Sequence, residues 1–250
     1  MKTKIYLVFI SLLSVFSLKA QISDSSINVL KFSIHYSIHT PSADMAKRFG
    51  FSSMIGGSLD YKLKSNWSFG LDASYLFGGN IKDSSSIFSE IMTETGYIIN
   101  QYGEYATFSL SERGFYAGAN ISKLIPVLGP NKNSGILINI GGGLLQHHIH
   151  IENKDNNAPP ILGDYKKGYD KLSNGFSVKE FIGYQYLDNK GLINFYLGFE
   201  FYQAFTMSRR DYDFNLMGYD NTKRKDFLSG FRFGWIIPVY TKAPDKYYFY

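Results

Sequence analysis

The chain of 250 residues contains no cysteine and only two tryptophans, and charged residues make up 19% of it. Without a thiol the protein can form no disulfide and cannot carry a thiol-linked lipid anchor. Outside the N-terminal region, no stretch approaches the run of about 20 apolar residues that a membrane-spanning helix needs. If the chain crosses a membrane, it must therefore do so as strands.

The first residues have the features of a secretory signal. Two lysines precede the apolar run Ile5–Leu18, which is too short for a comfortable membrane span, and Ala20 provides a small residue before the cut. We therefore predict a signal peptide over residues 1–20 and one mature domain over residues 21–250; the alternative is a buried N-terminal helix. The segment removed holds three lysines and no acid, so the formal net charge falls from +5 to +2, and nothing indicates a nucleic-acid partner.

Aromatic residues and glycine are abundant, with 20 Tyr, 21 Phe and 24 Gly. Tyrosine and phenylalanine favour strands, and glycine occurs at turns, bulges and tight barrel corners. The stretch "INFYLGFEFYQAF" shows the pattern most clearly, because Phe199 and Phe201 share one face of a strand while Glu200 lies on the other. Where Glu200 points decides the class of protein.

Apolar and polar residues alternate with a period of two in eight segments. The predicted strands cover residues 28–39, 53–63, 67–77, 113–122, 135–151, 176–186, 193–202 and 228–239. The fifth changes phase near Gln146, which predicts a bulge there, and the faces of the sixth cannot be assigned. Short and long connections alternate strictly, as in an antiparallel up-and-down barrel with short periplasmic turns and four longer extracellular loops.

The signal, the eight alternating strands and the aromatic C-terminus together resemble the small outer-membrane β-barrels of the OmpA/OmpX type. The resemblance covers residues 21–250 and rests on architecture, so it implies a fold, an outer-membrane location and contact with membrane lipids, but no activity. One departure is the tail after Tyr240, which follows the last predicted strand. A soluble barrel of the lipocalin kind would show the same alternation with its faces reversed; the large aromatic faces favour the membrane barrel.

In such a barrel Glu200 faces the interior, which in an eight-stranded barrel is just wide enough for side chains to fill. Arg232 lies on the neighbouring strand and is the expected partner of Glu200. The inward faces also carry Asp72, Lys31 and Asp60, and we predict that these charges form lumen ion pairs. An ion pathway is the alternative, which the narrow lumen disfavours.

Histidines occur in two groups, and four of them are weak candidates for metal ligands. His35 and His39 face inward from the first strand, and His148 and His150 share one face of the fifth. A lipid-modifying enzyme of the lipid A acylase or deacylase type is a second possibility, with His147 or His148, a nearby serine and Glu152 as base, nucleophile and orienting acid. No motif fixes the serine, so we expect no cofactor and no catalytic site.

The long loops are rich in cationic and aromatic residues, which are enriched at binding hot spots. We predict that they bind other outer-membrane or surface proteins or the phosphates of lipopolysaccharide. The candidate residues are Arg209, Arg210, Tyr212, Lys166, Lys167 and Tyr169. The leading interpretation is a non-enzymatic barrel that serves as an accessory or scaffold subunit of an outer-membrane assembly or secretion complex. Lipid-modifying enzyme and small passive channel are the alternatives.

Overall fold

The computed structural model describes residues 25–82, 84–188 and 193–240, so the predicted signal peptide and the tail after Tyr240 lie outside the described residues. Eight strands make up the fold, with short helical turns between some of them. The elements are β1 (Val29–Ala43), α2 (Met45–Arg48), β2 (Ser52–Lys62), β3 (Trp67–Gly78), α3 (Ser84–Ile87), β4 (Phe108–Ile125), β5 (Gly135–Asn153), η1 (Pro159–Ile161), η2 (Tyr165–Gly168), β6 (Ser173–Leu187), β7 (Asn194–Ser208) and β8 (Lys223–Tyr240).

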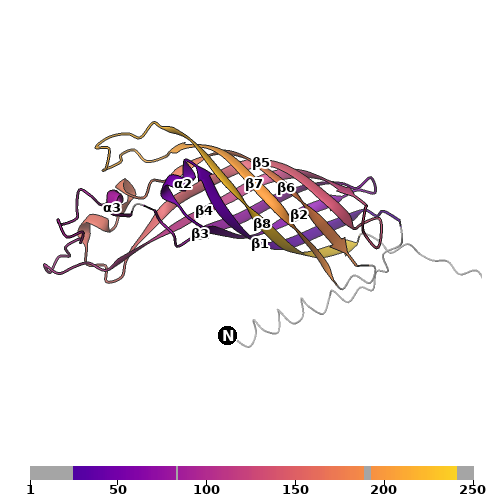
Figure 1. Ribbon diagram of the computed structural model, residues 1–250, viewed down its shortest axis with the longest axis horizontal. Helices are drawn as coiled ribbons and strands as arrows, with labels where there is room; N and C mark the ends of the chain where they lie inside the picture. Colours follow the sequence, from indigo (N-terminus) through magenta and orange to yellow (C-terminus); the bar gives the residue numbers. More distant parts are fainter. Residues whose placement is uncertain (1–24, 83, 189–192, 241–250) are drawn as a thin grey trace, which may run out of the picture.

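The strands form one closed barrel in chain order, shown side-on in Figure 1. Each strand pairs antiparallel with the next, and β8 pairs with β1. Following the register round the ring from Val29 leads back to β1 at His39, ten residues further along. This offset requires the strands to tilt relative to the barrel axis, as Figure 1 shows. The predicted eight-stranded up-and-down barrel is confirmed.

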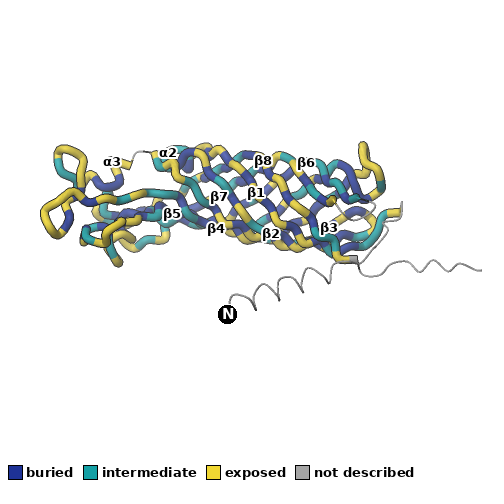
Figure 2. Tube along the Cα trace, turned by 90° about the horizontal axis from the view of Figure 1, so that it is seen from below, coloured by how far each residue is buried: buried dark blue, intermediate teal, exposed yellow. Residues whose placement is uncertain are grey.

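Buried and exposed residues alternate along the strands, as the colours of Figure 2 show. On β3, Phe69 and Leu71 are 52% and 64% exposed, whereas Asp72 and Ser74 point inward and are buried. Charged residues inside and aromatic residues outside are the reverse of a soluble barrel, so the lipocalin alternative is wrong. The chain is a transmembrane β-barrel.

The predicted bulge near Gln146 is absent. The pairing of β5 with β4 and with β6 continues in one register past this residue. What changes is the polarity of the two faces: beyond His147 the outward residues are His148 and His150, and the inward ones are Ile149 and Ile151. We attribute this reversal to the strand leaving the membrane. The backbone stays regular, while the surroundings of its outer face change from lipid to water.

Several strands run further toward the long loops than the alternation predicts. β4 begins at Phe108 and β8 at Lys223. At this end the barrel wall therefore projects beyond the band of outward-facing apolar and aromatic residues, here called the apolar band. Figure 1 shows α2 and α3 at the same end, which we call the loop end, with the short connections at the opposite, turn end. Within the described ranges, none of the helices is long and apolar enough to cross a membrane.

Candidate functional site

The barrel interior is layered. An apolar cluster lies toward the turn end beside buried polar residues such as Lys62 and Gln185, a charged layer follows at mid-height, and a second apolar cluster continues toward the loop end. The first cluster consists of Leu124, Leu137, Phe181, Leu187, Tyr196 and Ile236. The charged side chains of this layer are buried, so they must satisfy one another.

Arg232 is the centre of the charged layer. Its Nη1 donates to Glu200 Oε2 over 3.0 Å, its Nη2 donates to Asp72 Oδ2, and its Nε donates to the Tyr196 hydroxyl over 3.1 Å. Arg232 is 4% exposed and Glu200 is fully buried. The predicted contact between Glu200 and Arg232 is therefore present, and Asp72 joins it from the other side of the lumen.

The two inward histidines of β1 belong to the same network. Arg232 Nη2 lies 2.8 Å from His35 Nδ1, and His35 Nε2 lies 2.8 Å from Ser74 Oγ. Because a guanidinium can only donate, His35 Nδ1 accepts this hydrogen bond. The ring proton is then on Nε2, which donates to Ser74 Oγ. His39 Nε2 contacts Glu200 Oε1 over 2.8 Å. Both imidazoles are thus used by lumen partners, which leaves little basis for metal ligation.

Lys179 completes the layer and was not predicted, because it belongs to the strand whose faces could not be assigned. Its Nζ lies 3.0 Å from Asp72 Oδ2, and its side chain is buried. Two cations, Arg232 and Lys179, thereby face two carboxylates, Asp72 and Glu200. The layer is balanced in charge, provided that both carboxyls are ionised.

Lys31 and Asp60 were both predicted to take part in lumen ion pairs, but they do not pair with each other. They are register partners on β1 and β2, yet Lys31 Nζ donates to Gln185 Oε1 over 2.9 Å and Asp60 accepts from Ser58 over 3.0 Å. No ion pair joins the two in the described part of the chain. Gln185, across the lumen, supplies the acceptor for Lys31 in place of a carboxylate.

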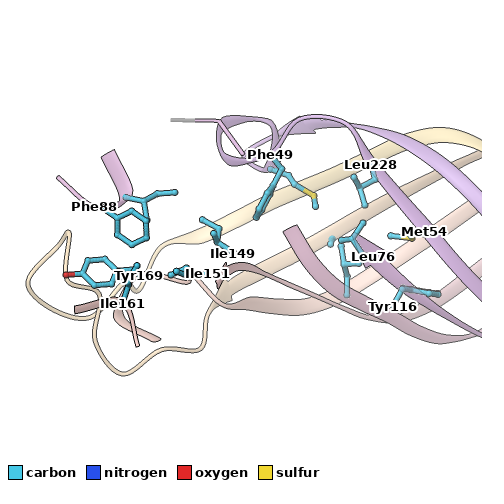
Figure 3. Close-up of a cluster of buried hydrophobic side chains, with 14 of the residues drawn as sticks. Phe49, Met54, Leu76, Phe88, Tyr116, Ile149, Ile151, Ile161, Tyr169 and Leu228 are labelled. Carbon is cyan, nitrogen blue, oxygen red and sulfur yellow. The ribbon is translucent and has the colours of Figure 1, made fainter. Parts of the chain in front are cut away.

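The lumen is closed on both sides of the charged layer. A cavity of about 30 Å³, lined by Lys31, Asp60 and Arg232 among others, lies toward the turn end and has room for only one or two waters. Toward the loop end the buried apolar side chains continue in a row from the barrel interior into the loops, as Figure 3 shows. They include Met54, Leu76, Tyr116 and Leu228 inside the barrel and Phe88, Ile161 and Tyr169 among the loops.

A polar cluster interrupts this row where β5 and β8 approach the loop end. His147 Nε2 lies 2.9 Å from Asp226 Oδ2, and both side chains are fully buried. The alternative catalytic arrangement with His147 is not formed, because Glu152 points outward and is exposed while His147 pairs with Asp226. His148 shares the outward face with Glu152, but no hydrogen bond joins the two among the described residues. Thr206, not a serine, donates to the same carboxylate. A buried pair without access to substrate is a structural contact.

The remaining histidine candidates lie on the other side of the wall. His148 and His150 face outward, with ring centroids 6.5 Å apart, so they cannot meet His35 and His39 inside the barrel. Among residues 25–82, 84–188 and 193–240, no group of three or more His, Cys, Asp or Glu side chains is placed to hold a metal ion. One metal ion therefore cannot be bound by both pairs of candidate histidines.

The loops have a small apolar core of their own. The Tyr169 ring contacts Phe88 at 5.2 Å and Phe214 at 4.9 Å between centroids, which joins three separate loops. Burial raises the pKa of the Tyr169 hydroxyl, and only 5% of the residue is exposed. Tyr169 was predicted to bind a partner, but its side chain is buried and packs the loops against one another.

The predicted cationic binding residues divide in the same way. Arg210 makes a two-point contact with Asp170, and this hydrogen bonding raises the pKa of the guanidinium. Arg210 is therefore tied into the loop structure. Lys166, Lys167, Arg209 and Tyr212 are exposed, although Lys167 pairs with Asp164 and Arg209 donates to Asn174. These four remain available at the surface.

The most exposed large side chains of the loops were not among the predicted binding residues. Tyr102, Tyr165 and Tyr219 are 71%, 65% and 70% exposed, and Met217 is 64% exposed. They lie in or beside turns, so no strand or helix periodicity marks them as surface or core. Aromatic composition of the loops was the only available signal, and it did not separate these residues from buried ones such as Tyr169.

No protein-family model and no curated protein matches this chain. Among solved structures, similarity is found to Ail, the attachment invasion locus protein of Yersinia pestis, with a TM-score of 0.43 and 10% identity over 84% of this chain and 99% of that one. Similarity is also found to Neisserial surface protein A, with a TM-score of 0.42 and 14% identity over 83% of this chain and 96% of that one. For the outer membrane protein OprG from Pseudomonas aeruginosa, the TM-score is 0.37 and the identity is 10% over 86% of this chain and 99% of that one. At such low identity, no residue of those proteins can be equated with a particular residue of this chain.

Proposed function

We propose that this protein is a non-enzymatic, closed outer-membrane barrel that docks partner proteins through its loop end, as an accessory or scaffold subunit of an assembly or secretion complex. One observation carries the proposal: the loops pack on a core of their own and present exposed tyrosines outward. Loops that served only as flexible linkers would need neither feature. Tyrosine supplies contact area at low entropic cost.

The state of the lumen supports docking over transport. Buried charges and two apolar clusters fill the barrel, which disfavours the passive channel. The enzyme alternative has less support, because His147 is buried against Asp226 and no serine hydroxyl bonds to it in the described residues. Arg209, at the outer rim, adds a cation that suits a lipopolysaccharide phosphate.

We expect Tyr102→Ser/Tyr219→Ser to reduce co-purification of the partner from native membranes by about tenfold or more, because hot-spot aromatics contribute about 2 kcal/mol or more each. The matched control is Glu94→Ser/Asn221→Ser, which changes exposed polar residues in the same two loops. A tag after Asp155 should be reachable from outside intact cells, which tests the proposed orientation.

Two results would oppose the proposal. Unchanged co-purification in the tyrosine variant would remove the docking surface, and a tag reachable only after cell lysis would reverse the orientation. Altered lipid A chemistry after replacing His147, His148 and His150 together would favour the enzyme.

A further inference from the structure

Glu180 is a carboxylate on the outer, lipid-facing side of the wall. The outward residues of β6 run Phe176, Val178, Glu180, Ile182, Tyr184, so two apolar or aromatic residues flank Glu180 in each direction along the strand. Phe176 and Ile182 are 58% and 57% exposed. The side chain therefore lies inside the apolar band and not at its edge.

The neighbouring strands agree with this placement. The register partners of Glu180 are Ile140 on β5 and Phe201 on β7, and both face outward. Hydrocarbon offers no hydrogen-bonding partner to a carboxyl group, and ionisable residues at this depth are costly and usually functional.

Contacts within the chain satisfy Glu180 only in part. Within the described residues, Glu180 accepts one hydrogen bond, which Gln203 Nε2 donates over 3.5 Å, the upper limit of such a bond. No ion pair involves Glu180 among the described residues. Gln203 itself points outward from β7, so the two polar groups support each other within the lipid-facing surface without leaving it.

Further polar groups extend this surface across the barrel wall. Ser229 on β8 is the register partner of Phe201, and Thr40 on β1 is the register partner of Ser229. Ser229 Oγ donates to the Thr40 carbonyl over 3.5 Å. Glu180, Gln203, Ser229 and Thr40 thus form a polar path, here called the Glu180 surface, from mid-band toward the loop end.

The charge pattern of this chain argues against a second copy as the occupant. Outward-facing cations of the described strands lie near the two ends: Lys123 packs over Trp67 at the turn end, with Nζ 4.9 Å from the ring centroid, while Arg113, Lys223 and Lys225 lie at the loop end. A second copy at the same depth would therefore present no cation to Glu180. A lipid headgroup cannot reach the middle of a hydrocarbon core about 30 Å thick.

We propose that the Glu180 surface is the contact site for a different membrane-embedded protein, one that places a lysine or arginine side chain at mid-bilayer depth. Association pairs the carboxylate with a cation and removes both from lipid. This goes beyond the docking proposed above, since it uses the lipid-facing wall and no loop residue.

The test places a photoreactive amino acid at Phe201, beside Glu180, in the full chain in native membranes. We expect a discrete adduct with another membrane protein that falls at least tenfold when Glu180→Leu is added and persists with the matched change Ile182→Leu. A photoreactive residue at Phe69, on the β3 wall, should label lipid only. An adduct of two copies of this chain, lipid labelling only at Phe201, or an adduct indifferent to Glu180→Leu would each overturn the proposal.

A second measurement separates this contact from a folding role. Purified Glu180→Leu barrel without a partner should unfold at a higher urea concentration than the unmodified protein, because a carboxyl group leaves the lipid face. A lower midpoint would assign Glu180 to the stability of this chain and would contradict the proposal.

Discussion

Glu200→Ala should lower the free energy of unfolding by about 3–5 kcal/mol, the usual cost of breaking one side of a buried ion pair. Glu200 is fully buried and accepts from Arg232, His39 and Tyr202. Its removal leaves the charged layer with two cations and a single carboxylate. Arg232→Met should cost a similar amount for the opposite reason, since two carboxylates would then face Lys179 alone.

The double change Glu200→Leu/Arg232→Met should cost far less than the sum of the two single ones. It leaves Asp72 with Lys179, which are already 3.0 Å apart and form a balanced pair. Residues in contact are not additive, and coupling energies of about 0.5–3 kcal/mol are typical. The arrangement of the layer, with two cations and two carboxylates, thus predicts a large favourable coupling.

A double-mutant cycle by urea unfolding in detergent or lipid measures this coupling, with Glu200→Leu as the first single variant. Glu152→Ala, which removes an exposed carboxylate at the loop end, is the control and should change stability by no more than about 0.5 kcal/mol. Strict additivity of the two lumen changes would show that Glu200 and Arg232 act independently.

Phe199→Arg should destabilise the barrel by about 2–4 kcal/mol, because it places a cation on the lipid face near mid-membrane. Phe199 is 43% exposed and contacts Phe231 with ring centroids 5.6 Å apart. It lies next to Glu200 in sequence but on the opposite side of the wall, so the two variants test the two faces separately.

Refolding into lipid vesicles, followed by urea titration, measures the loss for Phe199→Arg. Tyr219→Arg provides the control, since it makes the same kind of change at an exposed loop residue and should be close to neutral. An equally small effect at Phe199 would mean that this face does not meet lipid, and the assignment of inside and outside would fail.

Alternation predicted most of the fold because each strand has one apolar and one polar face. It failed on β6, where Phe181 points inward and Glu180 outward. The lumen accepts the Phe181 ring because Gly183 and Gly198 leave room beside it: a side chain on either glycine would meet the ring. With an aromatic residue on the inner face and a carboxylate on the outer one, the sequence did not show which face of β6 is which. The inward position of Lys179, a member of the charged layer, was therefore not predicted.

The loop end was less predictable for a different reason. Burial there depends on contacts between segments far apart in sequence, such as Phe88, Tyr169 and Phe214, and no local period marks them. The contact of Glu200 with Arg232 was predictable because neighbouring strands with known faces bring them together. The partners His35 and Asp72 could be assigned to the lumen, but their distances depend on the tilt of the strands, which the sequence does not specify.

The conductance of the unmodified protein in a planar lipid bilayer tests the central claim, a barrel closed by its own side chains, most directly. The charged layer, the apolar clusters on both sides of it and a cavity of only about 30 Å³ predict no stable conductance. Glu200→Leu/Arg232→Met should also stay closed, because apolar side chains still fill the lumen. A stable open channel in the unmodified protein would contradict the closed lumen and, with it, the proposal of a docking subunit in place of a pore.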